Sequence, residues 1–157
     1  MSFNESFLSP TIPSQIAKNV WVGDMNVAKD FGFFVRNNIK RVVNCTPDVP
    51  FHFSWCSYMR IPVGDSSSKI QNEVMKNAIP TALRFILEPR PSDFDAVLIH
   101  CHVGVSRSCT VAAAVLRACC ASTIPQSIAM VVTRRPVAFF NGTQLNFRKA
   151  LYAVFQQ

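Results

Sequence analysis

Residues 96–108 read AVLIHCHVGVSRS, and this short stretch points to both a fold class and a chemistry. Its first four residues form an uninterrupted apolar run of strand length, which is typical of a central strand covered on both faces by helices. The Ala- and Leu-rich segment from Ser108 to Cys120 then predicts a buried helix. The strand, the loop and the helix together predict an α/β protein, in which ligands bind at the carboxyl ends of the strands.

The loop between this strand and this helix has the composition of a phosphate site. A helix N-terminus at the end of a strand offers free N–H groups to an anion, and Gly104 relieves the turn that would be hardest for other residues. Arg107 adds a planar guanidinium that can donate two parallel hydrogen bonds to phosphoryl oxygens. The residues predicted to bind the phosphate are His102, Val103, Gly104, Val105, Ser106 and Arg107.

Cys101 lies at the base of this loop and is the predicted nucleophile. The helix dipole, the inward amides and the charge of Arg107 each favour thiolate over thiol. Ser108 can donate a hydrogen bond to the sulfur when a phosphocysteine breaks down. Cys101, Arg107 and Ser108 together indicate the attack of a thiolate on a phosphoester.

Thiolate attack on a phosphoester also needs an acid that protonates the departing oxygen. Asp65 is the first candidate, because it lies in the loop IPVGDSSS, residues 61–68, after a strand whose end should reach the same edge of the sheet. Asp48, which also lies in a loop after a strand, is the second candidate. Asp65 taken alone would be read as a solvated turn residue, so its assignment depends on this context.

The remaining segments alternate strands and helices, and the second half is mostly helical. The other predicted strands are 20–23, 39–44 and 56–63, and the other predicted helices run from Asn26 toward Asn38, over 70–87, from Thr123 to Arg134, and after Asn141. Asn26 and Asn141 are expected to cap their helices, and Pro80 is expected to kink or split the helix over 70–87. We therefore predict an α/β fold with a central, mostly parallel sheet of about five strands flanked by helices.

Length and composition predict one compact domain. The chain has 157 residues, of which 49% are hydrophobic, and a formal net charge of +7. We expect an N-terminal arm over residues 1–14 and one catalytic domain over 15–157, without a membrane-spanning segment or a secretory signal. The expected location is the cytoplasm, with the nucleus as an alternative. The basic residues are scattered, so no nucleic-acid partner is expected, and the cysteines lack zinc-ligand spacing.

The motif from His100 to Ser108 resembles the signature of the dual-specificity phosphatases, within the cysteine-dependent protein tyrosine phosphatase superfamily. The resemblance extends to WVGD at 21–24, VNCTP at 43–47, the segment IPVGD ending at Asp65, and RRP at 134–136 followed by Asn141. It implies a protein tyrosine phosphatase-like fold. It also implies hydrolysis of phosphotyrosine and of phosphoserine or phosphothreonine in proteins, through a phosphocysteine on Cys101.

The same resemblance implies roles for further residues. Asp65 would act first as an acid and then as a base on water, and His100 and Asn44 would support the loop. No metal and no cofactor would be needed. The chain departs from the family in its spacing after Asn141, in Pro80 and in the serine run after Asp65, and these departures affect the rim of the site and the choice of substrate.

Several alternatives stay open at this point. The same chemistry could act on phosphoinositides or on RNA 5′-phosphates, although the absence of lysine from the loop disfavours both. A catalytically silent adaptor would bind phosphoproteins without turnover, and the presence of both Cys101 and Asp65 argues against it. Asn44 could cap local backbone instead. Cys45 or Cys109 could form a disulfide with an oxidised Cys101, or both could be buried, inert thiols. The oligomeric state is not predicted.

Overall fold

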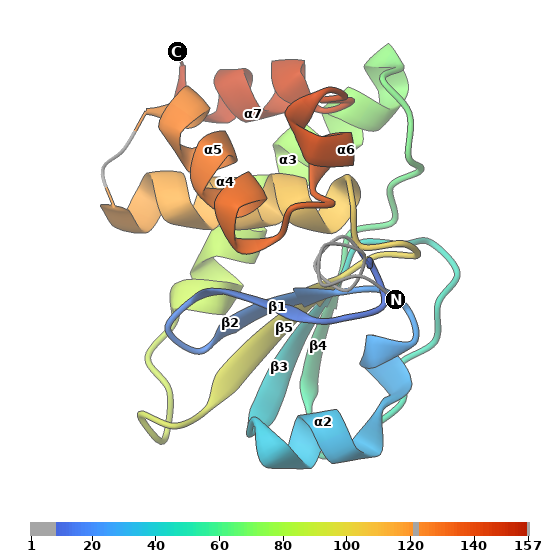
Figure 1. The fold of residues 1–157 in the computed structure, drawn as a ribbon, viewed down its shortest axis with the longest axis vertical. Helices are drawn as coiled ribbons and strands as arrows, with labels where there is room; N and C mark the ends of the chain where they lie inside the picture. The colour runs from blue at the N-terminus through green and yellow to red at the C-terminus, as the bar shows by residue number, and fades with distance from the viewer. Residues whose placement is uncertain (1–8, 121–122, 157) are drawn as a thin grey trace.

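The computed structural model describes residues 9–120 and 123–156, and within these residues the chain forms a five-stranded sheet with helices on both faces (Figure 1). The strands are β1 (Ser14–Ala17), β2 (Val20–Gly23), β3 (Ile39–Asn44), β4 (Ser57–Arg60) and β5 (Ala96–His100), in the spatial order β1-β2-β5-β3-β4. β1 pairs antiparallel with β2, and the other pairs are parallel. The prediction of a mostly parallel sheet of about five strands is confirmed.

β5 is the central strand, and its two faces explain its continuous apolar run. All of its residues are buried. Val97 and Ile99 belong to the core that includes helix α4 (Arg107–Cys120), whereas Ala96 and Leu98 belong to a second core that includes helix α2 (Phe31–Arg36). Successive side chains of a strand point to opposite faces, so a strand that is covered on both faces needs an apolar residue at each position.

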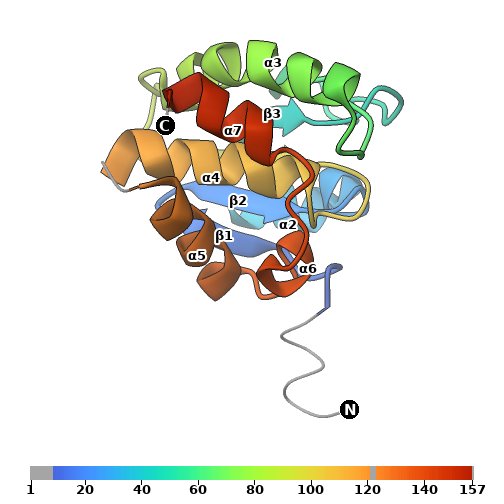
Figure 2. The same ribbon diagram turned by 90° about the horizontal axis from the view of Figure 1, so that it is seen from above.

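One face of the sheet carries most of the helices. These are α3 (Lys69–Leu87), α4, α5 (Ile124–Arg134), α6 (Phe139–Gly142) and α7 (Arg148–Phe155), while α2 and the short 3-10 turn η1 (Val27–Lys29) cover the other face. Figure 2 shows α4 running between α3 and α7 on one side and α5 on the other. α4 is therefore the central helix of its layer, directly after the central strand.

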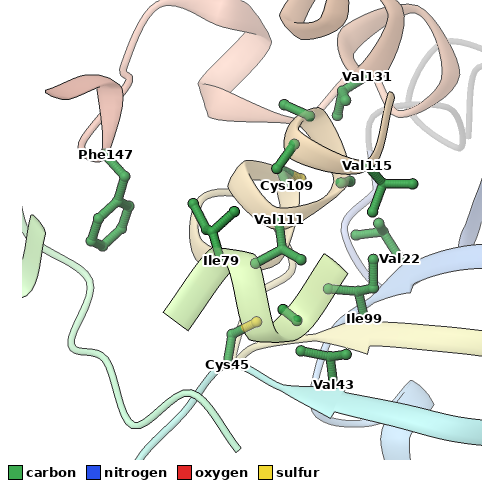
Figure 3. Packing of buried hydrophobic residues seen from close by; sticks show 14 of the residues in the cluster. Val22, Val43, Cys45, Ile79, Ile99, Cys109, Val111, Val115, Val131 and Phe147 are labelled. Atoms are coloured by element: carbon green, nitrogen blue, oxygen red, sulfur yellow. The ribbon is translucent and has the colours of Figure 1, made fainter. Parts of the chain in front are cut away.

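The packing between α4 and the sheet holds the start of this helix in place. Figure 3 shows Val22, Val43 and Ile99 on three neighbouring strands close to Val111 and Val115 of α4. Each of these side chains is at most 1% exposed. Burial of an aliphatic side chain of this size contributes about 1.5–3 kcal/mol. The first turn of α4 thus has a fixed position relative to the end of β5.

The strand register brings three loops to one edge of the sheet. Gly23 at the end of β2 and Asn44 at the end of β3 both pair with His100 at the end of β5. The carboxyl ends of these parallel strands are therefore level. The loops that follow them meet at this edge, where an open α/β sheet places its ligands.

The segment between β2 and β3 differs from the predicted single helix, because it consists of η1 followed by α2. Asp24 accepts the N–H groups of Asn26 and Val27, both at 2.9 Å, and Asp30 caps α2 by accepting the N–H of Phe33 at 3.1 Å. Asn26 makes no side-chain cap. The predicted cap at Asn26 is wrong, since carboxylates on either side of it take the free N–H groups.

Two predictions about the later helices also need correction. α3 runs from Lys69 to Leu87 with Pro80 inside it, so the expected split at Pro80 is wrong, while the expected kink stays a prediction. Pro80 is exposed, so its ring lies on the solvent side of the helix. Asn141 does not cap the last helix: it lies inside α6 with a φ of 60°, and α7 begins only at Arg148, without a side-chain cap. Asparagine is one of the few residues that tolerate this left-handed backbone.

The N-terminal part of the described chain contains a strand that the sequence pattern does not predict. β1 is an edge strand whose pairing with β2 shifts between Gln15 and Ala17. Most of the expected arm, residues 1–8, lies outside the described residues, and the division into arm and domain stays a prediction. Within residues 9–120 and 123–156, no single helix is long and apolar enough to cross a membrane; α4 and α5 meet that criterion only as a pair bent by 119°.

Candidate active site

Cys101 lies directly after β5 and is only 2% exposed. Its sulfur accepts a hydrogen bond from the Gly104 N–H at 3.2 Å. The Ser108 hydroxyl lies 3.2 Å from the same sulfur. The structure thus brings the predicted nucleophile, the loop and the first turn of α4 together, and polar hydrogens surround the sulfur.

Hydrogen bonds to three of its own carbonyl groups hold the loop after Cys101, residues 102–106, from its outer side. The acceptors are the carbonyls of His102, Gly104 and Val105, and their donors are Met25 N at 3.0 Å, Arg135 Nε at 2.6 Å and Phe139 N at 2.7 Å. In a planar trans peptide, the N–H that follows a carbonyl points the opposite way. Because these three carbonyls point outward, the N–H groups that follow them point to the inner side of the loop. Such a concave set of amides binds anions.

Gly104 is the residue that allows the chain to make this turn. Its φ is +75°, in the left-handed region. A Cβ at this position would lie 2.7 Å from Nη2 of Arg135 and 2.8 Å from the backbone carbon and oxygen of Gly23. Both the backbone angle and the lack of space therefore require glycine here.

Arg107 is the first residue of α4 and is 7% exposed. Its Nη1 donates to the carbonyl of Val63 at 2.9 Å, which ties the guanidinium to the loop after β4. Within the described part of the chain, two buried donors lack a hydrogen-bond partner, Arg107 Nε and Ser106 Oγ, besides one on Arg90. Buried polar groups are almost always paired, so two unpaired donors on one loop indicate a place for an anionic ligand.

Asp65 lies two residues after Val63, the residue that binds Arg107. Its side chain is exposed, and its carboxylate accepts a hydrogen bond from Asn146 Nδ2 at 2.9 Å. The neighbouring Gly64 N–H donates to Gln71 Oε1 at 2.7 Å, which fastens this loop to α3. Asp65 therefore lies on a loop that is tied to Arg107 on one side and to α3 and Asn146 on the other.

Asp48, the second candidate acid, has a different partner. Its carboxylate lies 2.8 Å from Nε2 of His102, and both side chains are at least a third exposed. This hydrogen bond is the main cause that lowers the pKa of Asp48 below its ordinary value. Asp48 is therefore held as a carboxylate next to the rim histidine of the loop, and it is poorly suited to donate a proton.

His100 and Asn44, the two predicted supporting residues, are both buried. Burial lowers the pKa of His100 to about 4, so it is neutral near pH 7, and its Nδ1 lies 3.4 Å from the Cys101 carbonyl oxygen. Asn44 donates to the Val49 carbonyl at 2.8 Å and accepts from the backbone N and the hydroxyl of Thr46 at 3.1 and 2.6 Å. These bonds match the local-cap interpretation of Asn44 rather than a contact with the phosphate loop.

The cysteines near the site are free thiols. Burial raises the pKa of Cys109 to about 12 and that of Cys45 well above its ordinary value, so both are uncharged at neutral pH. A disulfide between either one and Cys101 stays a prediction. Among residues 9–120 and 123–156, no group of three or more histidine, cysteine, aspartate or glutamate side chains could hold a metal ion.

Two residues that contact the site were not predicted to do so. Arg135 is 1% exposed and binds the loop at Gly104, whereas in the sequence it belongs to the RRP segment of the family resemblance, to which no contact was assigned. Asn146 binds Asp65 across 81 residues of chain. The long sequence separation of both contacts explains why local patterns do not reveal them.

Known proteins resemble this chain in sequence. Residues 20–157 match the family model described as dual specificity phosphatase, catalytic domain. The dual specificity protein phosphatase Mpk3 of Drosophila melanogaster is 34% identical over 120 residues, which are 74% of this chain and 28% of that protein. The chain spans less than a third of the length of the curated relatives it matches.

Solved structures share the fold. Human DUSP28 superposes with a TM-score of 0.75 at 20% identity, over 94% of this chain and 97% of that chain. The human tyrosine phosphatase-like serine/threonine/tyrosine-interacting protein superposes with a TM-score of 0.75 at 16% identity, over 92% of this chain and 98% of that chain. At these identities the two structures show the fold alone.

Proposed function

Because this chain belongs to the dual specificity phosphatase catalytic-domain family, we propose that it hydrolyses phosphotyrosine and phosphoserine or phosphothreonine in proteins. One observation carries the proposal. Hydrogen bonds hold carbonyl groups of the loop outward, and the N–H groups that follow them therefore point inward, to the side where the Gly104 N–H contacts the sulfur of Cys101. A phosphoryl group in this loop would meet the sulfur, the amides and the guanidinium of Arg107 at once.

The first step transfers the phosphoryl group to the protein. The sulfur of Cys101 attacks the phosphorus, and the bond between phosphorus and the substrate oxygen breaks. The electron pair of that bond leaves with the oxygen, which takes a proton from the carboxyl group of Asp65. The loop amides and Arg107 bind the equatorial oxygens while negative charge builds up on them. The products are a free hydroxyl and a phosphocysteine.

The second step returns the protein to its starting state. Water attacks the phosphorus and gives its proton to the carboxylate of Asp65, which becomes the acid again. The sulfur–phosphorus bond breaks and its electron pair returns to Cys101. The Ser108 hydroxyl, 3.2 Å from this sulfur, donates a hydrogen bond to the departing thiolate. Inorganic phosphate is released.

Asp65 is favoured over Asp48 as the acid because the two carboxylates have different partners. Asp48 pairs with His102, whose hydrogen bond lowers its pKa. Asp65 accepts one hydrogen bond from a neutral amide and belongs to the loop that binds Arg107 through Val63. These partners make Asp65 the better candidate for the acid.

The rival functions lack a specific supporting observation. The loop side chains at the variable positions are His102, Val103 and Val105, and none of them is a lysine, which would supply a second permanent charge for a polyphosphorylated lipid headgroup or an RNA end. A silent adaptor would not need Ser108 next to the sulfur or an acid on a tethered loop. Protein phosphatase activity therefore accounts for more of the site than either rival.

Turnover of aryl and alkyl phosphates by matched variants tests the proposal. We expect Cys101→Ser to abolish hydrolysis of p-nitrophenyl phosphate and of phosphotyrosine and phosphothreonine peptides. Asp65→Asn keeps the acceptor for Asn146 and should lower kcat about 100-fold or more on the peptides. Its effect should be smaller on p-nitrophenyl phosphate, because p-nitrophenolate departs without needing a proton.

Asp48→Asn is the control, since it keeps an oxygen for His102 and should change kcat by less than about threefold. Equal rates of hydrolysis for the wild-type protein and Cys101→Ser would refute catalysis by Cys101. Equal losses for Asp65→Asn and Asp48→Asn would refute the choice of acid. Binding of phosphopeptides without turnover would support the adaptor instead.

A further inference from the structure

Arg135 follows α5 and is the largest fully buried side chain among those described, at 1% exposure. Its Nε donates to the Gly104 carbonyl at 2.6 Å. Its two terminal nitrogens donate to the carbonyls of Ile12 and Pro10 at 2.7 and 2.8 Å and to the hydroxyl of Ser14 at 3.0 Å. One guanidinium thus joins the phosphate loop to the beginning of the described chain.

We call residues 10–14 the N-terminal strap. The strap leads into β1, which contacts α5, so it passes directly beside Arg135. It precedes residue 20, where the match to the family model begins. The support that Arg135 receives from Pro10, Ile12 and Ser14 is therefore provided by a segment outside that match.

Arg135 brings a positive charge to the outer side of the loop. Neither of the ion pairs found within residues 9–120 and 123–156 includes it. The titratable groups that act on it are the sulfurs of Cys109 and Cys101 and the carboxylate of Asp24, and Asp24 accepts two backbone N–H groups of its own. A buried cation is costly unless it is compensated, and here neutral carbonyl and hydroxyl oxygens compensate it while leaving its charge in place.

We propose that Arg135, supported by the N-terminal strap, is a positioning residue for the phosphate loop. It keeps the Gly104 carbonyl turned outward, so that the following N–H points toward the bound phosphate. It also places a fixed positive charge on the outer side of the loop, which favours the bound dianion. The proposal rests on the proposed function, because it assigns Arg135 a part in the same loop.

The alternative is that Arg135 only fastens the fold together. A purely structural role predicts that its loss changes stability but not the behaviour of Cys101 in the molecules that remain folded. The two roles therefore differ in the reactivity of Cys101 and in phosphate affinity, both of which can be measured without turnover.

The experiment compares Arg135→Met, Arg135→Lys and two deletions. Deletion of residues 2–13 removes the Pro10 and Ile12 carbonyls and leaves Arg135 in place. Deletion of residues 2–8 is its control, because it keeps Pro10, Ile12 and Ser14, the acceptors of Arg135 among the described residues of the strap. For each protein, iodoacetate alkylation of Cys101 is followed against pH by peptide mapping, which separates it from the exposed Cys119 and Cys120.

We expect Arg135→Met to slow alkylation of Cys101 about tenfold, because the loop whose Gly104 N–H contacts the sulfur loses its support at the Gly104 carbonyl. Inorganic phosphate bound in the loop should inhibit alkylation of Cys101, and the phosphate concentration needed for half inhibition should rise about tenfold in Arg135→Met. Arg135→Lys keeps a charged donor for the Gly104 carbonyl and should restore most of the alkylation rate, but not the phosphate affinity, because it lacks the planar fork that also binds Pro10 and Ile12. The longer deletion should weaken phosphate binding about threefold or more relative to the shorter one.

Unchanged alkylation and unchanged phosphate inhibition in folded Arg135→Met would overturn the proposal. If Arg135→Met does not fold, the comparison of the two deletions and of Arg135→Lys decides it, and identical phosphate inhibition in all of them overturns it equally. Failure of the proposed function has a different signature: the wild-type protein would not hydrolyse phosphopeptides, while alkylation of Cys101 could still be measured in every variant.

Discussion

Replacement of Gly104 by alanine separates the two reasons for a glycine in the phosphate loop. Gly104 and Gly142 both have a positive φ, +75° and +81°, so alanine strains the backbone at either position. At Gly104 the new Cβ would lie 2.8 Å from the backbone carbon and oxygen of Gly23, whereas at Gly142 the nearest atom is Val132 Cγ2 at 3.8 Å. Gly142→Ala is therefore a matched control that carries the strain without the clash.

The expected cost follows from these two contributions. A residue with a Cβ in the left-handed region costs about 1–2 kcal/mol, and an added carbon in a packed site costs about 1–3 kcal/mol more. Gly104→Ala should thus lower the free energy of unfolding by about 2–5 kcal/mol and Tm by about 4–20 °C. Gly142→Ala should lower Tm by about 2–8 °C.

The clash should also displace the loop relative to Arg107 and Cys101. A misplacement of about 1 Å at a catalytic loop costs about 100-fold in rate. We therefore expect kcat/KM of Gly104→Ala on a phosphotyrosine peptide to fall about 100-fold or more, and that of Gly142→Ala to stay within about threefold of wild type. Thermal melting by circular dichroism and steady-state kinetics measure the two quantities. Equal Tm losses and equal rates for the two variants would refute the argument from space at Gly104.

Two further predictions concern the residues that support the loops. Burial lowers the pKa of His100 to about 4, so at pH values below the ordinary pKa of histidine the unfolded chain binds a proton that the folded chain does not. The free energy of unfolding, measured with urea, should therefore fall by about 2 kcal/mol from pH 7.5 to pH 5. His100→Gln should flatten this pH dependence. Asn44→Ala removes the buried amide oxygen that accepts from Thr46 and the amide N–H that donates to the Val49 carbonyl, and should lower the free energy of unfolding by about 1–3 kcal/mol. An unchanged urea midpoint would contradict this structural role.

The parts of the site that lie close together in the sequence were predictable. Cys101, Gly104, Arg107 and Ser108 belong to one strand–loop–helix unit, in which the spacing itself determines which atoms face one another. The helix caps were predicted less well. An asparagine is as typical of a turn as of a helix cap. At Asn26 the carboxylate of Asp24 takes the free N–H groups instead, and Asn141 adopts a positive φ inside α6.

By itself, the amino-acid sequence determined a central buried strand, a loop with an inward set of amides and a thiol at its base, because alternation, glycine placement and a helix N-terminus act over a few residues. Only the tertiary structure decided what holds that loop from behind and what fastens the segment that carries Asp65. Arg135 contacts Pro10 across 125 residues and Gly104 across 31, and Asn146 contacts Asp65 across 81. Such contacts follow from the packing of α4, α5 and α7 on the sheet, and no local pattern specifies them.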